Sequence, residues 1–175
     1  MAFMSESEKV RELPNVMQHI KGKILDYGSG GSKIVPEAIG MDGRALPGVD
    51  IVCEDLENPN MVSQLVERFD VVFSSHFLEH TLEPYNMVMM WYQFLIPGGK
   101  LILYLPDGYH YSNKNNPEHM QDITYDNFMF WFKRCFCGEG KNYRGEYMPK
   151  YFELIEHGMD VGYDKYSFYI VAKAV

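Results

Sequence analysis

An apolar segment near the start of the chain runs directly into a glycine-rich turn. Lys23–Tyr27 reads as a buried strand with Asp26 near its end, and Gly28 and Gly30 follow at once. Because glycine has no Cβ atom, a ligand can approach the backbone closely at such a turn. Asp42 ends the next apolar segment, where a carboxylate can accept hydrogen bonds from both hydroxyls of a ribose. The spacing predicts a βαβ unit that handles a nucleotide-like ligand.

The rest of the pattern alternates between strands and helices, as in a doubly wound α/β fold. Pro14 is expected to divide the first helix, in which Ser5 and Glu8 have capping-box spacing, and Pro97 with two glycines is expected to turn the chain. The expected strands are Lys23–Tyr27, Glu37–Met41, Ile51–Cys53, Phe69–Ser74, Lys100–Leu105, Tyr151–Glu156 and Tyr166–Ala172, the last two as a hairpin, and the expected helices are Ser5–Ile20, Ser32–Val35 as a stub, Asn60–Arg68, Pro84–Leu95 and Tyr125–Arg134.

Length, composition and charge are typical of one compact enzyme. The 175 residues are 46% hydrophobic, which is enough for a well-buried core in a single domain over residues 1–175. No apolar run reaches the roughly 20 residues that span a bilayer, and no secretion signal is recognisable, so a cytoplasmic protein without a membrane span is expected. The net charge of -8 and the lack of a basic stripe lead us to expect no nucleic-acid partner. Neither length nor charge indicates the oligomeric state.

Metal ligation is not expected from the local motifs. Cys135 and Cys137 are separated by one residue, whereas zinc knuckles use two, and no second pair completes four ligands. His76–His80 fits His-x-x-Glu-His, a zinc-protease motif. That motif needs a long helix and a further acidic ligand, but here it follows a buried strand directly and Pro84 starts a new helix.

Several segments together resemble class I methyltransferases that use S-adenosylmethionine, in the small type-11-like branch associated with ubiquinone biosynthesis and sugars. The segments occur in the family's order between Lys23 and Asp107, about half of the chain. The sequence departs from the family pattern where a third glycine is common, because that position is Ser32 and the link to Asp42 is short. The matching segments are Leu25–Gly30, Gly40–Asp42, Glu54–Leu56, Phe69–His80 and Leu95–Leu101.

The resemblance implies a Rossmann-like, doubly wound α/β fold with a mostly parallel seven-stranded sheet. The implied strand order is 3-2-1-4-5-7-6 with the last strand antiparallel, in a three-layer sandwich. It also implies S-adenosylmethionine as cofactor, with an N-terminal helix over residues 1–20 and a substrate or lid segment over residues 107–150. The implied cofactor-binding residues are Asp26, Gly28, Ser29, Gly30, Asp42, Asp55, Leu56, Ser74 and His76.

Each implied contact has a chemical role. The glycine turn would supply backbone groups to the amino-acid part of the cofactor, Asp26 would favour its ammonium, and Asp42 would bind its ribose. Asp55 and Leu56 would contact the adenine. Alternatives stay open: Asp26 could cap the stub helix, Asp55 could cap the helix near residue 60, and Glu54 could take the place of Asp55.

Histidines after the fourth expected strand are the candidate catalytic residues. His76 has an unperturbed pKa that suits a general base, and His80 with Glu79 could assist it. Glu79 and His80 could equally shape and cap the next helix. His110 and His119 are alternative bases. Tyr109, Tyr111 and Trp131 could form an aromatic wall for the substrate or simply pack in the core or lid.

The expected function is methyl transfer to a small-molecule, sugar or lipid-linked acceptor, with O-methylation preferred because His76 offers a base. The segment Ser75–Leu78 stands where an Asp/Asn-Pro-Pro-Tyr motif would indicate methylation of a nucleobase amine. Two alternatives remain: an NAD(P)-dependent reductase, which would use the same glycine turn, and a non-catalytic methyltransferase-like scaffold.

Overall fold

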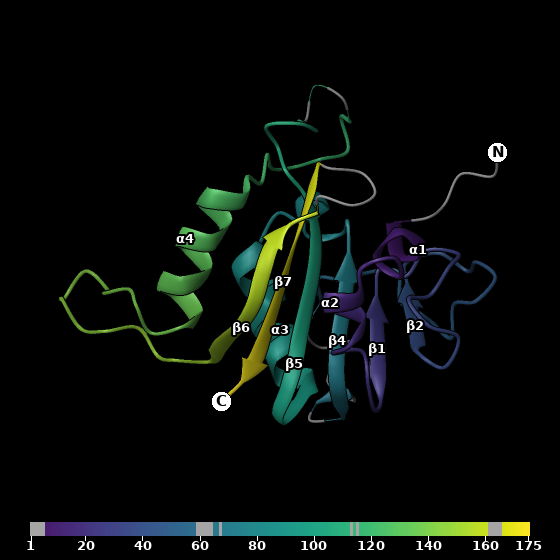
Figure 1. Cartoon of the computed structure of the whole chain (residues 1–175), viewed down its shortest axis with the longest axis horizontal. Helices are drawn as coiled ribbons and strands as arrows, with labels where there is room; N and C mark the ends of the chain where they lie inside the picture. Colours follow the sequence, from purple (N-terminus) through teal and green to yellow (C-terminus); the bar gives the residue numbers. More distant parts are fainter. Residues whose placement is uncertain (1–5, 59–64, 67, 113, 115, 161–165) are drawn as a thin grey trace.

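A seven-stranded sheet in the order β3-β2-β1-β4-β5-β7-β6 forms the centre of the molecule (Figure 1). The computed structural model describes residues 6–58, 65–66, 68–112, 114, 116–160 and 166–175. The first five strands in this order (β3, β2, β1, β4 and β5) pair in parallel, and β7 is antiparallel to both β5 and β6. The expected strand order, terminal hairpin and antiparallel last strand are confirmed. The strands are β1 (Ile24–Tyr27), β2 (Ile39–Asp42), β3 (Ile51–Val52), β4 (Phe69–Ser75), β5 (Leu95–Pro106), β6 (Phe152–Met159) and β7 (Ser167–Ala174).

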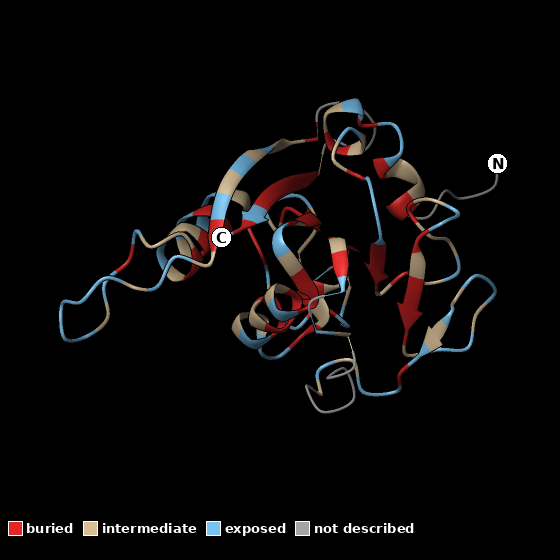
Figure 2. Ribbon diagram, turned by 90° about the horizontal axis from the view of Figure 1, so that it is seen from below, coloured by how far each residue is buried: buried red, intermediate tan, exposed pale blue. Residues whose placement is uncertain are grey.

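Helices cover both faces of this sheet, so the molecule has three layers. On one face, α1 (Glu6–Val10) and α2 (Pro14–Met17) pack on a core that includes Phe73 of β4. On the other face, α3 (Pro84–Phe94) and α4 (Tyr125–Phe136) share a larger core with the sheet. Figure 2 shows that buried residues dominate the central strands between these layers.

The helix before β5 follows its expected pattern closely. Pro84 occupies the first turn of α3, where its missing N–H costs no hydrogen bond. The side chains expected on one face are all buried against the sheet: Met87, Met90, Trp91 and Phe94. Pro14 likewise begins α2 and separates it from α1, as expected.

Two expectations about the connections are wrong. No helix occurs between β1 and β2, although Ser32–Val35 was expected to form a stub; the segment is irregular, because the N–H and carbonyl of Ile34 bond to the side chains of Asp26 and Arg11. Strand β5 begins at Leu95 rather than Lys100. The register shifts between Phe69 and Val71 of β4, so the Pro-Gly-Gly segment bulges within the strand.

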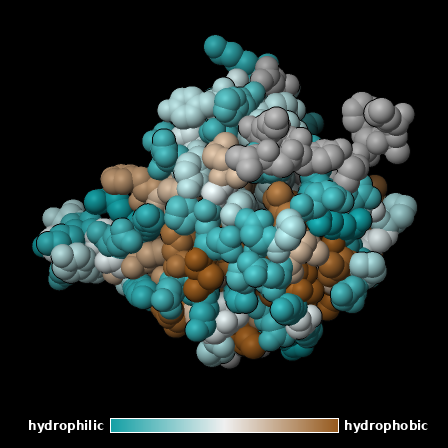
Figure 3. Space-filling model, in the orientation of Figure 1, coloured by the Kyte–Doolittle hydropathy of each residue, from teal (hydrophilic) through white to brown (hydrophobic). Residues whose placement is uncertain are grey.

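The remaining boundaries differ by a few residues, and α4 ends two residues later than expected. Most of the expected helix Asn60–Arg68, and the Ser5 cap, lie outside the described residues. In the part of the chain that the structure describes, no helix is long and apolar enough to cross a membrane. Figure 3 shows hydrophobic residues in separate patches among hydrophilic ones on one face.

Candidate active site

The turn after β1 uses its own backbone donors. Gly28 and Gly30 have φ values of 74° and 56°, a left-handed conformation that glycine adopts without strain. The N–H groups of Gly28 and Ser29 both donate to the carbonyl of Met41, at 2.8 and 3.0 Å. The N–H of Gly30 donates to Oδ2 of Asp42 at 2.9 Å. The donors expected to meet a cofactor are therefore already engaged between β1 and β2, because no helix follows the turn to draw the chain away.

The acid of β1 that precedes the turn is fully buried. Asp26 accepts a hydrogen bond from the N–H of Ile34 at 2.5 Å through Oδ2. It therefore closes the connecting loop, and does not cap a helix. Its Oδ1 is buried and has no hydrogen-bond partner among the described residues. Burial raises the pKa of Asp26 to about 7. An ammonium group beside Oδ1 would satisfy this oxygen, so the site fits the amino group of S-adenosylmethionine.

The acid at the end of β2 is bound on both oxygens. Oδ1 of Asp42 accepts hydrogen bonds from the backbone N–H and the Nε of Arg44, at 3.0 and 3.1 Å. Oδ2 accepts a hydrogen bond from the backbone N–H of Gly30. Burial opposes ionisation, but these hydrogen bonds from Arg44 and Gly30 outweigh it and hold the pKa of Asp42 below its ordinary value. The side chain of Arg44 is 71% exposed, so a ribose hydroxyl can replace it without disrupting the core.

Three other expected cofactor residues contact the protein itself. Asp55 is exposed, and its carbonyl accepts hydrogen bonds from the Cys53 thiol and the Asn58 N–H. The carbonyl of Leu56 accepts a hydrogen bond from the Tyr27 hydroxyl. The hydroxyl of Ser74 donates to the carbonyl of Tyr27 at 3.0 Å, which fastens β4 to β1. The side chain of Ser74 thus has a structural partner.

A strained residue directly follows strand β4. His76 has a φ of 48°, which is uncommon for a residue other than glycine and is found mostly where function or packing imposes it. Its Nε2 lies 3.0 Å from the Ser167 hydroxyl and its Nδ1 lies 3.6 Å from Glu79 Oε1. Burial lowers the pKa of His76 to about 3, and nearby Lys9 adds to the effect. The expectation of an ordinary pKa at His76 is wrong, because the sequence does not show how deeply the ring lies.

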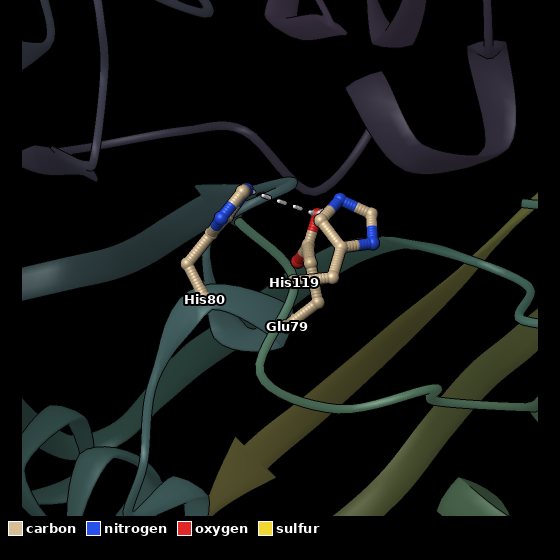
Figure 4. Close-up of side chains that lie close together, drawn as sticks. All are labelled: Glu79, His80 and His119. Atoms are coloured by element: carbon tan, nitrogen blue, oxygen red, sulfur yellow. Dashed lines mark ion pairs between the residues drawn. The ribbon is translucent and has the colours of Figure 1, made fainter. Parts of the chain in front are cut away.

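Glu79 is the centre of a histidine cluster (Figure 4). It lies in the short 3-10 helix η2 (Leu78–His80), and its Oε1 is 3.9 Å from His80 Nε2 and 4.0 Å from His119 Nε2. His119 comes from the segment after β5, and sequence patterns suggested it only as an alternative base. The cluster borders a cavity of about 230 Å³ lined by His76, Glu79, His80, Tyr111, Asn116, His119 and Tyr166.

The aromatic candidates separate into two environments. Tyr111 lines this cavity and stacks on Tyr166 with ring centroids 5.7 Å apart. Tyr109 is exposed, and so is His110. The Nε2 atom of His110 lies 4.0 Å from Oδ2 of Asp107. Trp131 instead lines a second cavity of about 190 Å³ beside α4. Only Tyr111 is therefore placed with the histidines.

The sheet order, the glycine turn and the acids that end β1 and β2 together define a class I, S-adenosylmethionine-dependent methyltransferase. Ligands of open α/β sheets bind at the carboxyl ends of the strands where the strand order reverses, which is between β1 and β4 here. The family described as a methyltransferase domain matches residues 6–139, and the chain belongs to this family. S-adenosylmethionine is the cofactor of the family.

Similar proteins agree with this assignment. Part of the chain is 29% identical to the ubiquinone biosynthesis O-methyltransferase of Coxiella burnetii over 104 residues, which cover 47% of this chain and 43% of that protein. The match thus spans under half the length of this curated relative. A SAM-dependent methyltransferase from Archaeoglobus fulgidus is 15% identical and has a TM-score of 0.60, covering 95% of this chain and 94% of that chain. An S-adenosylmethionine-dependent methyltransferase from Mesorhizobium loti is 13% identical with a TM-score of 0.60, covering 95% and 99%. These two structures support the fold.

Proposed function

We propose that the protein transfers a methyl group from S-adenosylmethionine to a hydroxyl group of a small-molecule, sugar or lipid-linked acceptor. The observation that carries the proposal is the polar cavity directly after β4, at the carboxyl edge of the parallel strands. Phe77 connects the two parts of the site, since it follows the cavity residue His76 and lies against Gly28 of the glycine turn. A methyl donor at the turn and an acceptor in the cavity would then be neighbours.

Residues of the turn are proposed to hold the cofactor, which supplies an activated methyl group on its sulfonium when bound. Asp26 suits the ammonium because its Oδ1 is buried without a partner among the described residues. Asp42 suits the ribose because its carboxylate stands at the tip of β2. The backbone over Gly30 is open to a ligand. The proposed set, carried over from the family resemblance, is Asp26, Gly28, Ser29, Gly30, Asp42, Asp55, Leu56, Ser74 and His76, with Ser74 contacting the cofactor other than through its hydroxyl, which donates to Tyr27.

His80 is proposed as the proton acceptor. Its Nδ1 lies 3.1 Å from the carbonyl oxygen of Glu118, which can only accept, so Nδ1 carries the proton and Nε2 keeps the lone pair. His80 is partly exposed and lines the cavity, so an acceptor hydroxyl can reach it. His76 is less suited to this role, because a pKa of about 3 makes it a weak base; it is proposed to shape the wall next to the cofactor.

The segment 107–150 is proposed to form the acceptor side of the site. It contributes Tyr111, Asn116 and His119 to the cavity. O-methylation is favoured over other transfers because the curated relative from Coxiella burnetii is named for it and because His80 can take a hydroxyl proton. The three cysteines are free thiols, which suits the reducing cytoplasm as the place of action. We also propose that residues 1–175 form a single domain and that the protein has no nucleic-acid partner.

Calorimetry with S-adenosylmethionine and with S-adenosylhomocysteine tests the cofactor half of the proposal. Wild-type protein is expected to bind both, whereas Asp42→Asn binds weakly and Asp126→Asn, an exposed acid on α4, binds like wild type. Labelled methyl incorporation into a metabolite extract then tests the acceptor half. Binding of neither compound would favour a non-catalytic scaffold, and binding of NADH instead would favour a reductase.

A further inference from the structure

We propose that Glu79, His80 and His119 form a binding site for a divalent transition-metal ion, Zn²⁺ in particular. One ligand atom from each residue lies within 4.8 Å of the other two. The donor atoms of a tetrahedral zinc site, with bonds of about 2.0–2.2 Å, stand roughly 3.4 Å apart. Small side-chain rotations would therefore bring the three atoms to bonding distance, and Figure 4 shows the rings of His80 and His119 beside the Glu79 carboxylate.

The backbone holds the third ligand in place. The N–H groups of Met120 and Gln121 both donate to the carbonyl of Glu79, at 2.8 and 3.3 Å. The side-chain amide of Gln121 donates to the carbonyl of Thr81 at 2.8 Å. These bonds tie the two residues that follow His119 to Glu79 and Thr81. His119 is thus positioned by the fold before any ion binds, which lowers the cost of assembling the site.

The hydrogen bond behind His80 is the kind that metal-binding histidines make. Its Nδ1–H donates to the Glu118 carbonyl, which fixes the ring and turns the Nε2 lone pair toward Glu79. The Nε2 lone pair of His80 and the Glu79 oxygen Oε1, 3.9 Å apart, are both donor atoms that a metal ion between them would bind.

The donor set identifies the ion. Two imidazoles and one carboxylate are the protein ligands of many catalytic zinc sites, which keep a further position open. Calcium and magnesium prefer oxygen ligands, so they are poor candidates. The open position here faces the cavity of about 230 Å³. The site differs from the His-x-x-Glu-His motif, because His76 is hydrogen-bonded to Ser167 and the second histidine is His119.

Metal binding and the proposed base role use the same lone pair. An ion on Nε2 of His80 prevents that atom from accepting a proton, so the two states exclude each other. The metal proposal rests on the cluster geometry alone and does not require methyl transfer or cofactor binding. Failure of one proposal can therefore be recognised without reference to the other.

Zinc titration of chelator-treated protein tests the site. Calorimetry with ZnCl₂ is expected to show one ion per chain and little binding of MgCl₂. His80→Ala and His119→Gln should each weaken zinc binding by more than about 10-fold, since losing a ligand costs at least as much as losing the outer-shell partner that orients it. His110→Ala is the matched control, because His110 lies in the same segment as His119 but its side chain is 57% exposed and outside the cluster.

Circular dichroism establishes that each variant is folded before its affinity is compared. The main variant is His80→Ala, because the His80 side chain is 32% exposed and its loss leaves the core intact. Absence of a stoichiometric zinc site in wild-type protein would overturn the proposal. Equal zinc affinity in wild type and His80→Ala would overturn it as well.

Discussion

The ring of Phe77 fills the space into which a side chain at Gly28 would project. A Cβ atom on Gly28 would lie 2.6 Å from Cδ2 of that ring, whereas a Cβ on Gly30 would meet nothing within 4 Å. Both glycines have left-handed backbone conformations. The turn therefore has a closed end at Gly28 and an open end at Gly30, and a ligand can approach the backbone only from the open end unless Phe77 moves.

Alanine at these two glycines should separate packing from ligand binding. Gly28→Ala is expected to lower the free energy of unfolding by about 2–5 kcal/mol, because left-handed strain and overlap with Phe77 add together. Gly30→Ala carries only the strain, about 1–2 kcal/mol, but should weaken S-adenosylmethionine binding. Urea denaturation and calorimetry measure the two effects. Equal losses of stability in both variants would show that Phe77 does not occupy the turn.

Asp42 and Arg44 should affect cofactor affinity in opposite directions. Asp42→Asn removes the charged acceptor of the ribose and is expected to raise the dissociation constant by about 10- to 100-fold. Arg44→Ala removes a competitor for the same carboxylate, so the constant should fall by up to about fivefold, the scale of a surface ion pair. Calorimetry at constant ionic strength measures both constants. Weaker binding by Arg44→Ala would place the guanidinium in the cofactor site.

Asp26 should make stability depend on pH. Its pKa is raised from 3.8 to about 7, so the folded protein holds a proton that the unfolded chain releases. The contribution is fully present below about pH 4 and is lost as the pH rises through 7, with an upper limit of about 4 kcal/mol. Asp26→Asn should therefore gain stability relative to wild type between pH 5 and pH 8. Urea denaturation at both values measures this gain, and Asp126→Asn should show none.

Ser74→Ala should distinguish a structural hydroxyl from a cofactor contact. The Ser74 hydroxyl donates to the Tyr27 carbonyl, so its loss is expected to lower the free energy of unfolding by about 1 kcal/mol. Cofactor affinity should stay within about twofold of wild type, since a change of 0.4 kcal/mol or less is expected. A large loss of affinity with unchanged stability would instead assign the hydroxyl to the cofactor.

Local sequence patterns were sufficient for most of the fold. Strand and helix periodicity predicted the parallel strands, the buried face of α3 and the terminal hairpin, because each depends on which side chains alternate or recur within a short segment. Proline positions predicted the start of α2 and of α3. The family resemblance then supplied the strand order, which no local pattern contains.

The site depended on contacts between distant segments. The sequence placed Gly28, Gly30 and Asp42 at strand ends, but only the folded chain shows that their groups bond one another. His119 and Glu79 are forty positions apart in the sequence, yet their side chains lie close together. The backbone hydrogen bonds that bring these segments together follow no sequence periodicity. Burial likewise decides the pKa of His76, and burial is a property of the assembled layers. Local composition thus determined the elements, and tertiary packing determined which polar groups meet and how strongly they hold their protons.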